Sequence, residues 1–306
     1  MIKPGKSKTW IDELQRSEGL PAAYTATVVD YVAPLAGRIL KSHTFLGRPV
    51  IIGINGAQGS GKSTFALFVA RWLQQELALR TVVLSLDDLY LGQQDRQALG
   101  RQHHPLLGTR GVPGTHDVGL GIELLDVLTV TGAQRDLRLP SFDKALDDQS
   151  RPSELCTIEA PVDVVLFEGW CVGAPPQPEE DLKDPVNELE EQEDAEGVWR
   201  SYANDQLGGD YAKLFGRLDA LIMLRVPALE KVLEWRELQE QKLRDKTSTN
   251  GMSPAELRRF VMHFERLTRH MLDVMPARAN TVIDIDHRHR MVAMSHGHWP
   301  FEQAAP

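Results

Sequence analysis

The sequence is poor in cysteine and contains no long apolar run, and these two shortages limit what the protein can be. Cys156 and Cys171 are the only cysteines in 306 residues, which fits a reducing compartment better than a disulfide framework. No apolar run approaches the roughly 20 residues that span a bilayer, and residues 1–8 lack the apolar core of a signal peptide. We therefore expect a soluble protein of the cytoplasm with no membrane partner.

The sequence also has no excess of basic over acidic residues. The net charge is −9, and the segment Ala174–Gly197 accounts for all of it with ten acidic residues against Lys183 alone. The rest of the chain is neutral, so it need not repel an anionic small molecule, and nothing in it suggests a nucleic-acid-binding face. The acidic segment opens with Pro175, Pro176 and Pro178, which predicts a solvated surface insert, with a role in gating as the alternative.

The most informative motif is a phosphate-binding loop between a strand and a helix. Gly56-Ala-Gln-Gly-Ser-Gly-Lys62-Ser63 follows the apolar run Val50–Ile54, and glycines such as Gly56 and Gly61 let a backbone wrap phosphates. Lys62 adds a positive charge toward the β and γ phosphates, and Ser63 supplies a hydroxyl for Mg²⁺. We therefore expect ATP and Mg²⁺ as ligands. The predicted nucleotide-binding residues are Gly56, Ala57, Gln58, Gly59, Ser60, Gly61, Lys62, Ser63 and Thr64.

Four further apolar runs predict an α/β fold. They are separated by helical stretches and, with the first run, predict a three-layer α/β/α arrangement around a mainly parallel sheet of at least five strands. The predicted strands are Val50–Ile54, Thr81–Leu86, Val162–Phe167, Ala220–Val226 and Thr281–Ile285. Residues 1–46 are predicted to form a helical N-terminal extension, and residues 47–306 the nucleotide-binding domain.

Carboxylates follow two of these strands. Asp87 and Asp88 come where the second strand ends, and ligands of open parallel sheets bind beyond the carboxyl ends of the strands. Asp87 is the candidate base for a kinase that acts on an alcohol, and Asp88 is a helix cap or a group near Mg²⁺. Glu168 ends the Asp163–Gly169 strand pattern and is expected to hold a water on Mg²⁺, unless it is only the polar end of a core strand.

The region between the two carboxylate strands gathers cations and hydrogen-bond donors. A small anionic acceptor needs such groups in fixed positions, although each of them taken singly is ordinary at a protein surface. The residues expected to bind the acceptor are Tyr90, Arg110, His116, Asp117, Lys144 and Arg151.

Two helices are predicted toward the C-terminus. Residues 227–246 form a polar helix in which Arg236, ahead of Lys242 and Arg244, is the candidate lid arginine, and a surface helix is the alternative. Ser253-Pro-Ala-Glu256 predicts a capped start for a second helix that reaches about residue 273. Four histidines beyond residue 286 have no accompanying cysteines and predict a disordered or surface tail rather than a zinc site.

Together these motifs resemble the P-loop kinases of small molecules that include uridine kinase, phosphoribulokinase and pantothenate kinase, and among them most closely the D-glycerate 3-kinase family. The resembling blocks are Gly56–Thr64, Ser85–Tyr90, Arg110–Asp117, Leu139–Lys144, Phe167–Gly173, Trp235–Leu243 and Gly251–Arg269. The resemblance implies transfer of the γ phosphate of ATP to a hydroxyl of glycerate. It assigns Asp87 as the base, Lys62 and Ser63 to nucleotide and metal, and Arg236 to the lid.

Two alternative functions remain at this stage. In the first, the protein is a kinase whose acceptor is a nucleoside or pantothenate. The region between Asp87 and Arg151, however, offers only Tyr90 and Phe142 for stacking against a base. The second is a nucleotide-gated switch, for which the sequence lacks the Asn-Lys-x-Asp element that reads guanine. The oligomeric state is not predicted.

Overall fold

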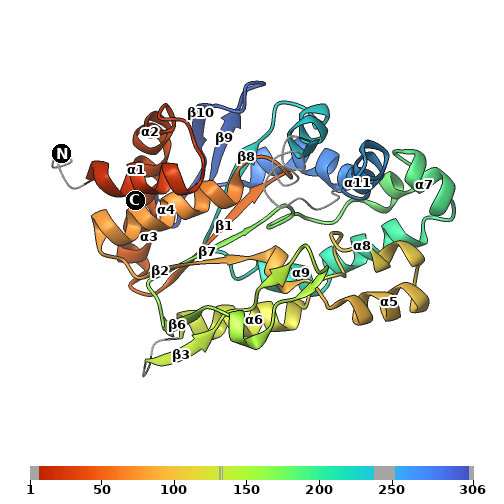
Figure 1. The fold of residues 1–306 in the computed structure, drawn as a ribbon, viewed down its shortest axis with the longest axis horizontal. Coiled ribbons are helices and arrows are strands. Elements are labelled where there is room, and N and C mark those ends of the chain that lie inside the picture. Colours follow the sequence, from red (N-terminus) through yellow and green to blue (C-terminus); the bar gives the residue numbers. More distant parts are fainter. Residues whose placement is uncertain (1–6, 131, 133, 238–251, 303–306) are drawn as a thin grey trace.

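The computed structural model describes residues 7–130, 132, 134–237 and 252–302. A six-stranded sheet lies at the centre (Figure 1), in the order β10-β9-β8-β1-β7-β2. All neighbours are parallel except β9 and β10, which are antiparallel. The α/β class and the five predicted strands are therefore confirmed. The strands are β1 Val50–Gly56, β2 Thr81–Ser85, β7 Val164–Gly169, β8 Ala220–Arg225, β9 Thr281–Ile285 and β10 Met291–His296.

Alternating side chains along the strands fill two separate cores, one on each face of the sheet. In β1, Ile52 and Ile54 pack on the face covered by the N-terminal helices and α4, whereas Ile51 packs on the face covered by α6, α9 and α11. Successive side chains of a strand point to opposite faces, so a strand that is apolar at every position must be covered on both. This is the three-layer arrangement that the sequence predicts.

Helices form the N-terminal region and the outer layers. The described part of residues 7–46 is α1, α2, a π-helical stretch and α3, and their apolar side chains belong to the same core as α4. The longest helix, α11, begins with the predicted capping box of Ser253 and Glu256 and ends at Arg278. The α-helices are α1 Ser7–Ser17, α2 Tyr24–Thr27, α3 Ala33–Leu46, α4 Lys62–Leu77, α5 Gln93–Gln102, α6 Val118–Thr129, α7 Glu188–Glu193, α8 Val198–Gly208, α9 Asp210–Phe215 and α11 Pro254–Arg278.

Two small antiparallel ladders lie outside the central sheet. One pairs β3 (Arg135–Arg138) with β6 (Thr157–Ala160), and the other pairs β4 (Phe142–Asp143) with β5 (Asp148–Gln149). None of the helices in the described ranges combines the length and the apolarity needed to cross a bilayer.

The expectation of a C-terminal tail is wrong. Met291–His296 adds to the sheet as β10, and the hydroxyl of Thr281 lies 2.9 Å from Nδ1 of His296 across the two strands. His289 belongs to the turn between β9 and β10 and has a left-handed backbone with φ of 62°. Residues 286–296 after β9 therefore continue the central sheet instead of forming a tail.

The acidic segment Ala174–Gly197 is folded rather than simply solvated. Glu190 is fully buried in an ion pair with Arg266 of α11, and Asp194 is 2% exposed in an ion pair with Arg200 of α8. Because carboxylates this deep in a protein need a paired charge, they fasten α7 to the helices around it. A sequence rich in acidic residues does not reveal which of them have such partners.

Candidate active site

The phosphate-binding loop runs from the end of β1 to the start of α4, as predicted. Gly59 and Gly61 have left-handed backbones, with φ of 77° and 83°, which side-chain-bearing residues rarely adopt. Gly56 is needed for a different reason than expected. A Cβ on Gly56 would lie 2.6 Å from the hydroxyl oxygen of Ser60, so the glycine leaves room for the loop to turn back on itself. The loop therefore has the tightly turned backbone that is needed to wrap a chain of phosphates.

The predicted metal ligands lie together next to this loop. Ser63 lies in the first turn of α4 and donates a hydrogen bond of 2.8 Å to Oε1 of Glu168 at the end of β7. Oε2 of Glu168 is buried without a hydrogen-bond partner among the described residues. An orphaned carboxylate oxygen beside a serine hydroxyl fits a hydrated divalent cation, because Mg²⁺ takes oxygen ligands and retains several waters.

The described start of the predicted lid helix, residues 229–237, packs on the phosphate loop. A Cβ on Gly59 would lie 2.8 Å from Cβ of Trp235, and the ring of Trp235 stacks on His289 with 4.2 Å between centroids. Arg236 lies beside the same glycine through its backbone nitrogen, and its guanidinium is 5.8 Å from the ring centroid of Phe260 on α11. The remainder of that helix, with Lys242 and Arg244, lies outside the described residues.

Asp87 follows β2 in a short 3₁₀ helix and lies among positive charges. Its Oδ2 is 2.6 Å from Nζ of Lys144, and its Oδ1 accepts a hydrogen bond of 3.3 Å from the hydroxyl of Tyr90. Burial alone would raise the pKa of Asp87, but the charges of Lys144 and Lys62 outweigh burial and hold that pKa well below its usual range. Asp87 is therefore ionised throughout the physiological pH range.

His116 is buried against Tyr90, close enough to Asp87 to feel its charge. Its ring stacks on Tyr90 with 4.4 Å between centroids, and its Nδ1 is 2.5 Å from the hydroxyl of Tyr211 on α9. Nε2 of His116 is buried and has no hydrogen-bond partner among the described residues. Burial lowers the pKa of His116 to about 3 despite the nearby charge of Asp87, so the imidazole is neutral. Sequence reasoning found His116 but not Tyr211, which is about a hundred residues further along the chain and matches no motif.

A carboxylate that the sequence did not single out holds Arg110 near the site. Asp147, in the turn between β4 and β5, forms ion pairs with Arg110 and with the fully buried Arg96 of α5. Both guanidinium groups lie 5.5 Å from the ring centroid of Phe142. Lys144 comes from the same turn. The β4–β5 turn thus carries both an anchor for Arg110 and the lysine that contacts Asp87.

Two predicted acceptor residues are not part of this cluster. The carboxylate of Asp117 accepts the N–H of Leu120 at 2.9 Å and caps α6, because a side-chain acceptor satisfies an otherwise unpaired donor at a helix start. Arg151 is exposed and precedes a 3₁₀ helix, and its backbone N–H pairs with Glu154. No contact found among the described residues joins Arg151 to Asp87.

Asp88 yields a prediction about stability and pH. Burial, with the neighbouring charge of Asp87, raises the pKa of Asp88 from 3.8 to about 6, although a hydrogen bond from the N–H of Phe142 opposes this shift. A raised pKa in the folded state means that ionisation destabilises the fold, so the penalty develops as pH rises from about 4 to about 6 and stays in full above that range. In the metal-free protein, Asp88→Asn should therefore increase the free energy of unfolding at pH 7.5 by on the order of 1 kcal/mol and change it little at pH 4.

Urea denaturation of both proteins across pH 4 to 8 measures this difference. Asp136→Asn, which replaces an exposed carboxylate of β3, serves as the control and should show no such pH-dependent gain. A gain for Asp88→Asn that is equal at every pH would contradict the assignment, because it would not follow the ionisation of Asp88.

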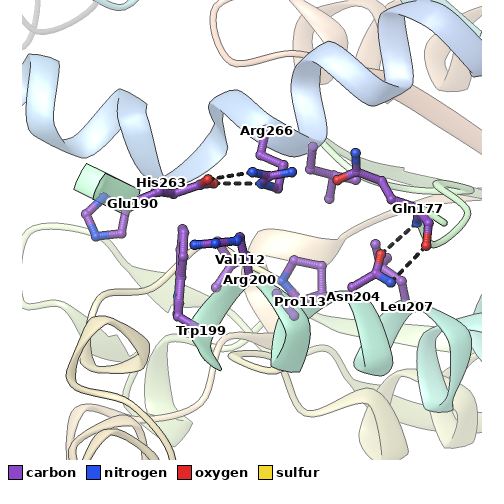
Figure 2. Close-up of a pocket in the computed structure, with 12 residues that line it drawn as sticks. Val112, Pro113, Gln177, Glu190, Trp199, Arg200, Asn204, Leu207, His263 and Arg266 are labelled. Atoms are coloured by element: carbon purple, nitrogen blue, oxygen red, sulfur yellow. Dashed lines mark hydrogen bonds and ion pairs between the residues drawn. The ribbon is translucent and has the colours of Figure 1, made fainter. Parts of the chain in front are cut away.

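A small cavity of about 30 Å³ lies between α8 and α11, behind the loop that carries His116 (Figure 2). Val112 and Pro113 of that loop line it, together with Trp199, Arg200 and Arg266. Both arginines form ion pairs and donate hydrogen bonds to backbone carbonyls. The volume suits one or two waters and not a substrate.

The chain is similar to known proteins over most of its length, although no protein-family model matches it. The uncharacterized kinase mug58 of Schizosaccharomyces pombe is 34% identical over 230 residues, which are 71% of this chain and 79% of that protein. The chloroplastic D-glycerate 3-kinase of Arabidopsis thaliana is 28% identical over 223 residues, which are 71% of this chain and 46% of that protein. The solved D-glycerate 3-kinase of Cryptococcus neoformans has a TM-score of 0.72 and 25% identity, and the match covers 87% of this chain and 99% of that one.

Proposed function

We propose, from the fact that the chain belongs to the D-glycerate 3-kinase family of P-loop kinases, that it transfers the γ phosphate of Mg·ATP to a hydroxyl of D-glycerate. Its kinase class follows from the family, and the proposal concerns the acceptor and the residues that act on it. The observation that supports it best is the 2.6 Å ion pair of Asp87 and Lys144 beside the phosphate loop.

The register of the central sheet supports this proposal. Ser85, the last residue of β2, pairs with Glu168 of β7, and Glu168 also pairs with Ile54 of β1. The phosphate loop, Glu168 with its partner Ser63, and Asp87 therefore lie at the ends of three adjacent strands, at one edge of the sheet. This is the place where ligands of open parallel sheets bind.

Each group has a distinct task in the proposed reaction. Lys62 and the loop N–H groups bind the phosphates, while Ser63 and Glu168 would hold Mg²⁺, which supplies charge neutralisation for the transferred phosphoryl group. Asp87 accepts the hydrogen bond of the attacking hydroxyl and orients its oxygen. Arg236 brings positive charge to the phosphoryl group when its helix closes.

The acceptor-side groups suit a small hydroxy acid. Lys144 is 59% exposed, so its ammonium group can turn from Asp87 toward the carboxylate of a bound acid. Arg110 adds a second cation whose position is fixed by Asp147. A nucleoside would need stacking surface, but Tyr90 is already stacked on His116 and packed edge-on by Phe142.

A coupled assay for ADP release tests the acceptor. We expect release that depends on D-glycerate and on Mg·ATP, and little release with uridine or pantothenate in place of glycerate. Product analysis by phosphorus NMR would then identify the phosphorylated hydroxyl. Turnover with uridine or pantothenate and none with glycerate would replace the proposed acceptor while leaving the kinase class intact.

Glu168→Gln should raise the Mg²⁺ concentration needed for half-maximal activity by about tenfold, which is typical when a group that holds a metal ligand in place loses its charge. The glutamine keeps an oxygen for the hydroxyl of Ser63, so the loop should remain folded. Steady-state rates at saturating ATP and acceptor over a range of MgCl₂ concentrations measure the effect. Glu159→Gln on β6, which is exposed, is the control. An unchanged Mg²⁺ requirement with a reduced maximal rate would assign Glu168 to the transfer step instead.

A further inference from the structure

The hydroxyl of Tyr211 joins two groups of the loop that carries the acceptor residues. The side chain of Tyr211 is fully buried, and its oxygen lies 3.0 Å from the backbone nitrogen of Gly114 and 2.5 Å from Nδ1 of His116. The ring of Tyr211 also packs edge-on against the imidazole, with 5.7 Å between centroids, while the backbone of His116 forms a bridge with that of Tyr90. The phenol is thus built into the support of His116.

The direction of these two hydrogen bonds can be worked out from the chemistry of the groups. The backbone N–H of Gly114 can only donate, so the phenol oxygen of Tyr211 accepts from it. Burial raises the pKa of Tyr211 well above its usual value, so the phenol keeps its proton. If Nδ1 of His116 also donated to the phenol oxygen, the phenol's own proton would be buried without an acceptor among the described residues, which costs free energy. The arrangement that satisfies every group has Tyr211 donating to Nδ1.

An accepting Nδ1 determines the state of the other ring nitrogen. A neutral imidazole carries one proton, and with Nδ1 accepting, that proton is on Nε2 of His116. Nε2 is the buried nitrogen that has no protein partner in the described part of the chain. The stack of Tyr90 on the ring restricts its rotation, so this N–H keeps a fixed direction beside Asp87.

We infer that Tyr211 is a positioning residue which fixes His116 in the tautomer protonated on Nε2, so that His116 donates an uncharged hydrogen bond to an oxygen of the acceptor. The identity of the acceptor in this inference rests on the proposed function, but the tautomer does not. A neutral N–H donor can bind a hydroxyl or carboxylate oxygen of the acceptor. Because it carries no positive charge, it does not weaken the ion pair of Lys144 with Asp87. An acceptor that lacks this oxygen would leave the buried N–H unpaired and would bind less well.

Four variants separate this role from simple packing. Tyr211→Phe keeps the ring and removes the hydroxyl, and it should raise the KM for the acceptor about tenfold while the KM for ATP stays unchanged. His116→Asn, whose amide nitrogen reaches only the place of Nδ1, should show a similar loss. His116→Gln places an N–H where Nε2 is and should retain most of the affinity for the acceptor. Adding Tyr211→Phe to His116→Gln should then cause no further loss, because there is no tautomer left to fix.

A matched control is Tyr202→Phe, since the ring of Tyr202 lies beside Gly114 but packs at a tilt on His103, and no described contact joins it to His116. Its KM for the acceptor should equal that of the unmodified protein. If Tyr211→Phe causes the same loss when added to His116→Gln as it does in the unmodified protein, Tyr211 only supports packing, and the inference is overturned.

The tautomer itself can be read without any assay of activity. In protein with ¹⁵N-labelled histidine, long-range proton–nitrogen spectra distinguish a protonated from an unprotonated ring nitrogen, and comparison with His116→Gln assigns the signals of His116. We expect a protonated Nε2 that persists from pH 5 to 8, and a mixture of tautomers in Tyr211→Phe. A protonated Nδ1 in the unmodified protein would overturn the inference even if the protein phosphorylates glycerate. A protonated Nε2 in a protein that ignores glycerate would contradict only the proposed acceptor.

Discussion

Asp87→Asn is expected to lower kcat about a thousandfold and to leave the affinity for ATP nearly unchanged, within the range usual for a lost catalytic acid–base group. Asparagine keeps the shape of the side chain and an oxygen for the hydroxyl of Tyr90, but it loses the charge that attracts Lys144 and the attacking hydroxyl. The pKa of Asp87 lies well below its usual range, so in the proposed reaction Asp87 would act mainly by orienting the hydroxyl and stabilising the proton as it leaves. Full protonation of the carboxylate comes only late in such a transfer.

Steady-state kinetics with the acceptor and calorimetric titration with a non-hydrolysable ATP analogue measure the two parts of this prediction. Asp88→Asn is the neighbouring comparison, since the carboxylate of Asp88 accepts the N–H of Phe142 and is expected to matter far less for turnover. If the analogue binds weakly to Asp87→Asn, Asp87 contributes to nucleotide binding, and its assignment as the base is contradicted.

The central sheet was predictable because its strands are buried on both faces. Val50–Gly56 and Val164–Gly169 are buried at every position, and such strands appear in the sequence as unbroken apolar runs between turns. Strand β10 was missed for the opposite reason. It is an edge strand with four exposed positions, so it carries the polar residues that are also typical of a tail. Burial, rather than strand formation as such, produces the pattern that sequence reasoning detects.

The candidate site was predictable where one short segment contains the whole motif. The phosphate loop and Asp87 are such cases, because the strand end and the next few residues determine their position. Tyr211 and Asp147 are not. They reach His116 and Arg110 from a separate helix and a separate hairpin, and only the packing of those elements brings the side chains together. Asp117 shows a contact that the motif did not reveal, since its place in a conspicuous loop predicted acceptor binding and in the structure its carboxylate caps α6.

The folded acidic segment leads to the second prediction of large effect. The guanidinium of Arg266 forms two hydrogen bonds with the carboxylate of Glu190, at 2.8 and 2.7 Å (Figure 2). It also donates to the carbonyls of Asp181 and Asp184. Arg266→Met would leave a fully buried carboxylate without its cation. Breaking one partner of a buried pair typically costs about 3–5 kcal/mol, and we expect a loss of that size in the free energy of unfolding from urea denaturation.

The same two helices provide a matched control. Arg259 of α11 also pairs with a carboxylate of α7, that of Glu193, but these side chains are 49% and 40% exposed. Arg259→Met should therefore cost at most about 1 kcal/mol, the usual range for a surface ion pair. If the two substitutions destabilise the protein equally, burial of the first pair does not determine its contribution.

Removing both members of the buried pair separates the cost of an unpaired charge from the value of the pair itself. In Arg266→Met with Glu190→Met neither charge of this pair remains, so much of the lost stability should return. The recovery should be incomplete, because the carbonyls of Asp181 and Asp184 still lack the donors that Arg266 supplies. A double variant as unstable as Arg266→Met alone would mean that the guanidinium acts mainly through those carbonyls. At Arg266 the acidic segment would then be held to α11 mainly through its backbone, and the carboxylate of Glu190 would contribute little to the attachment.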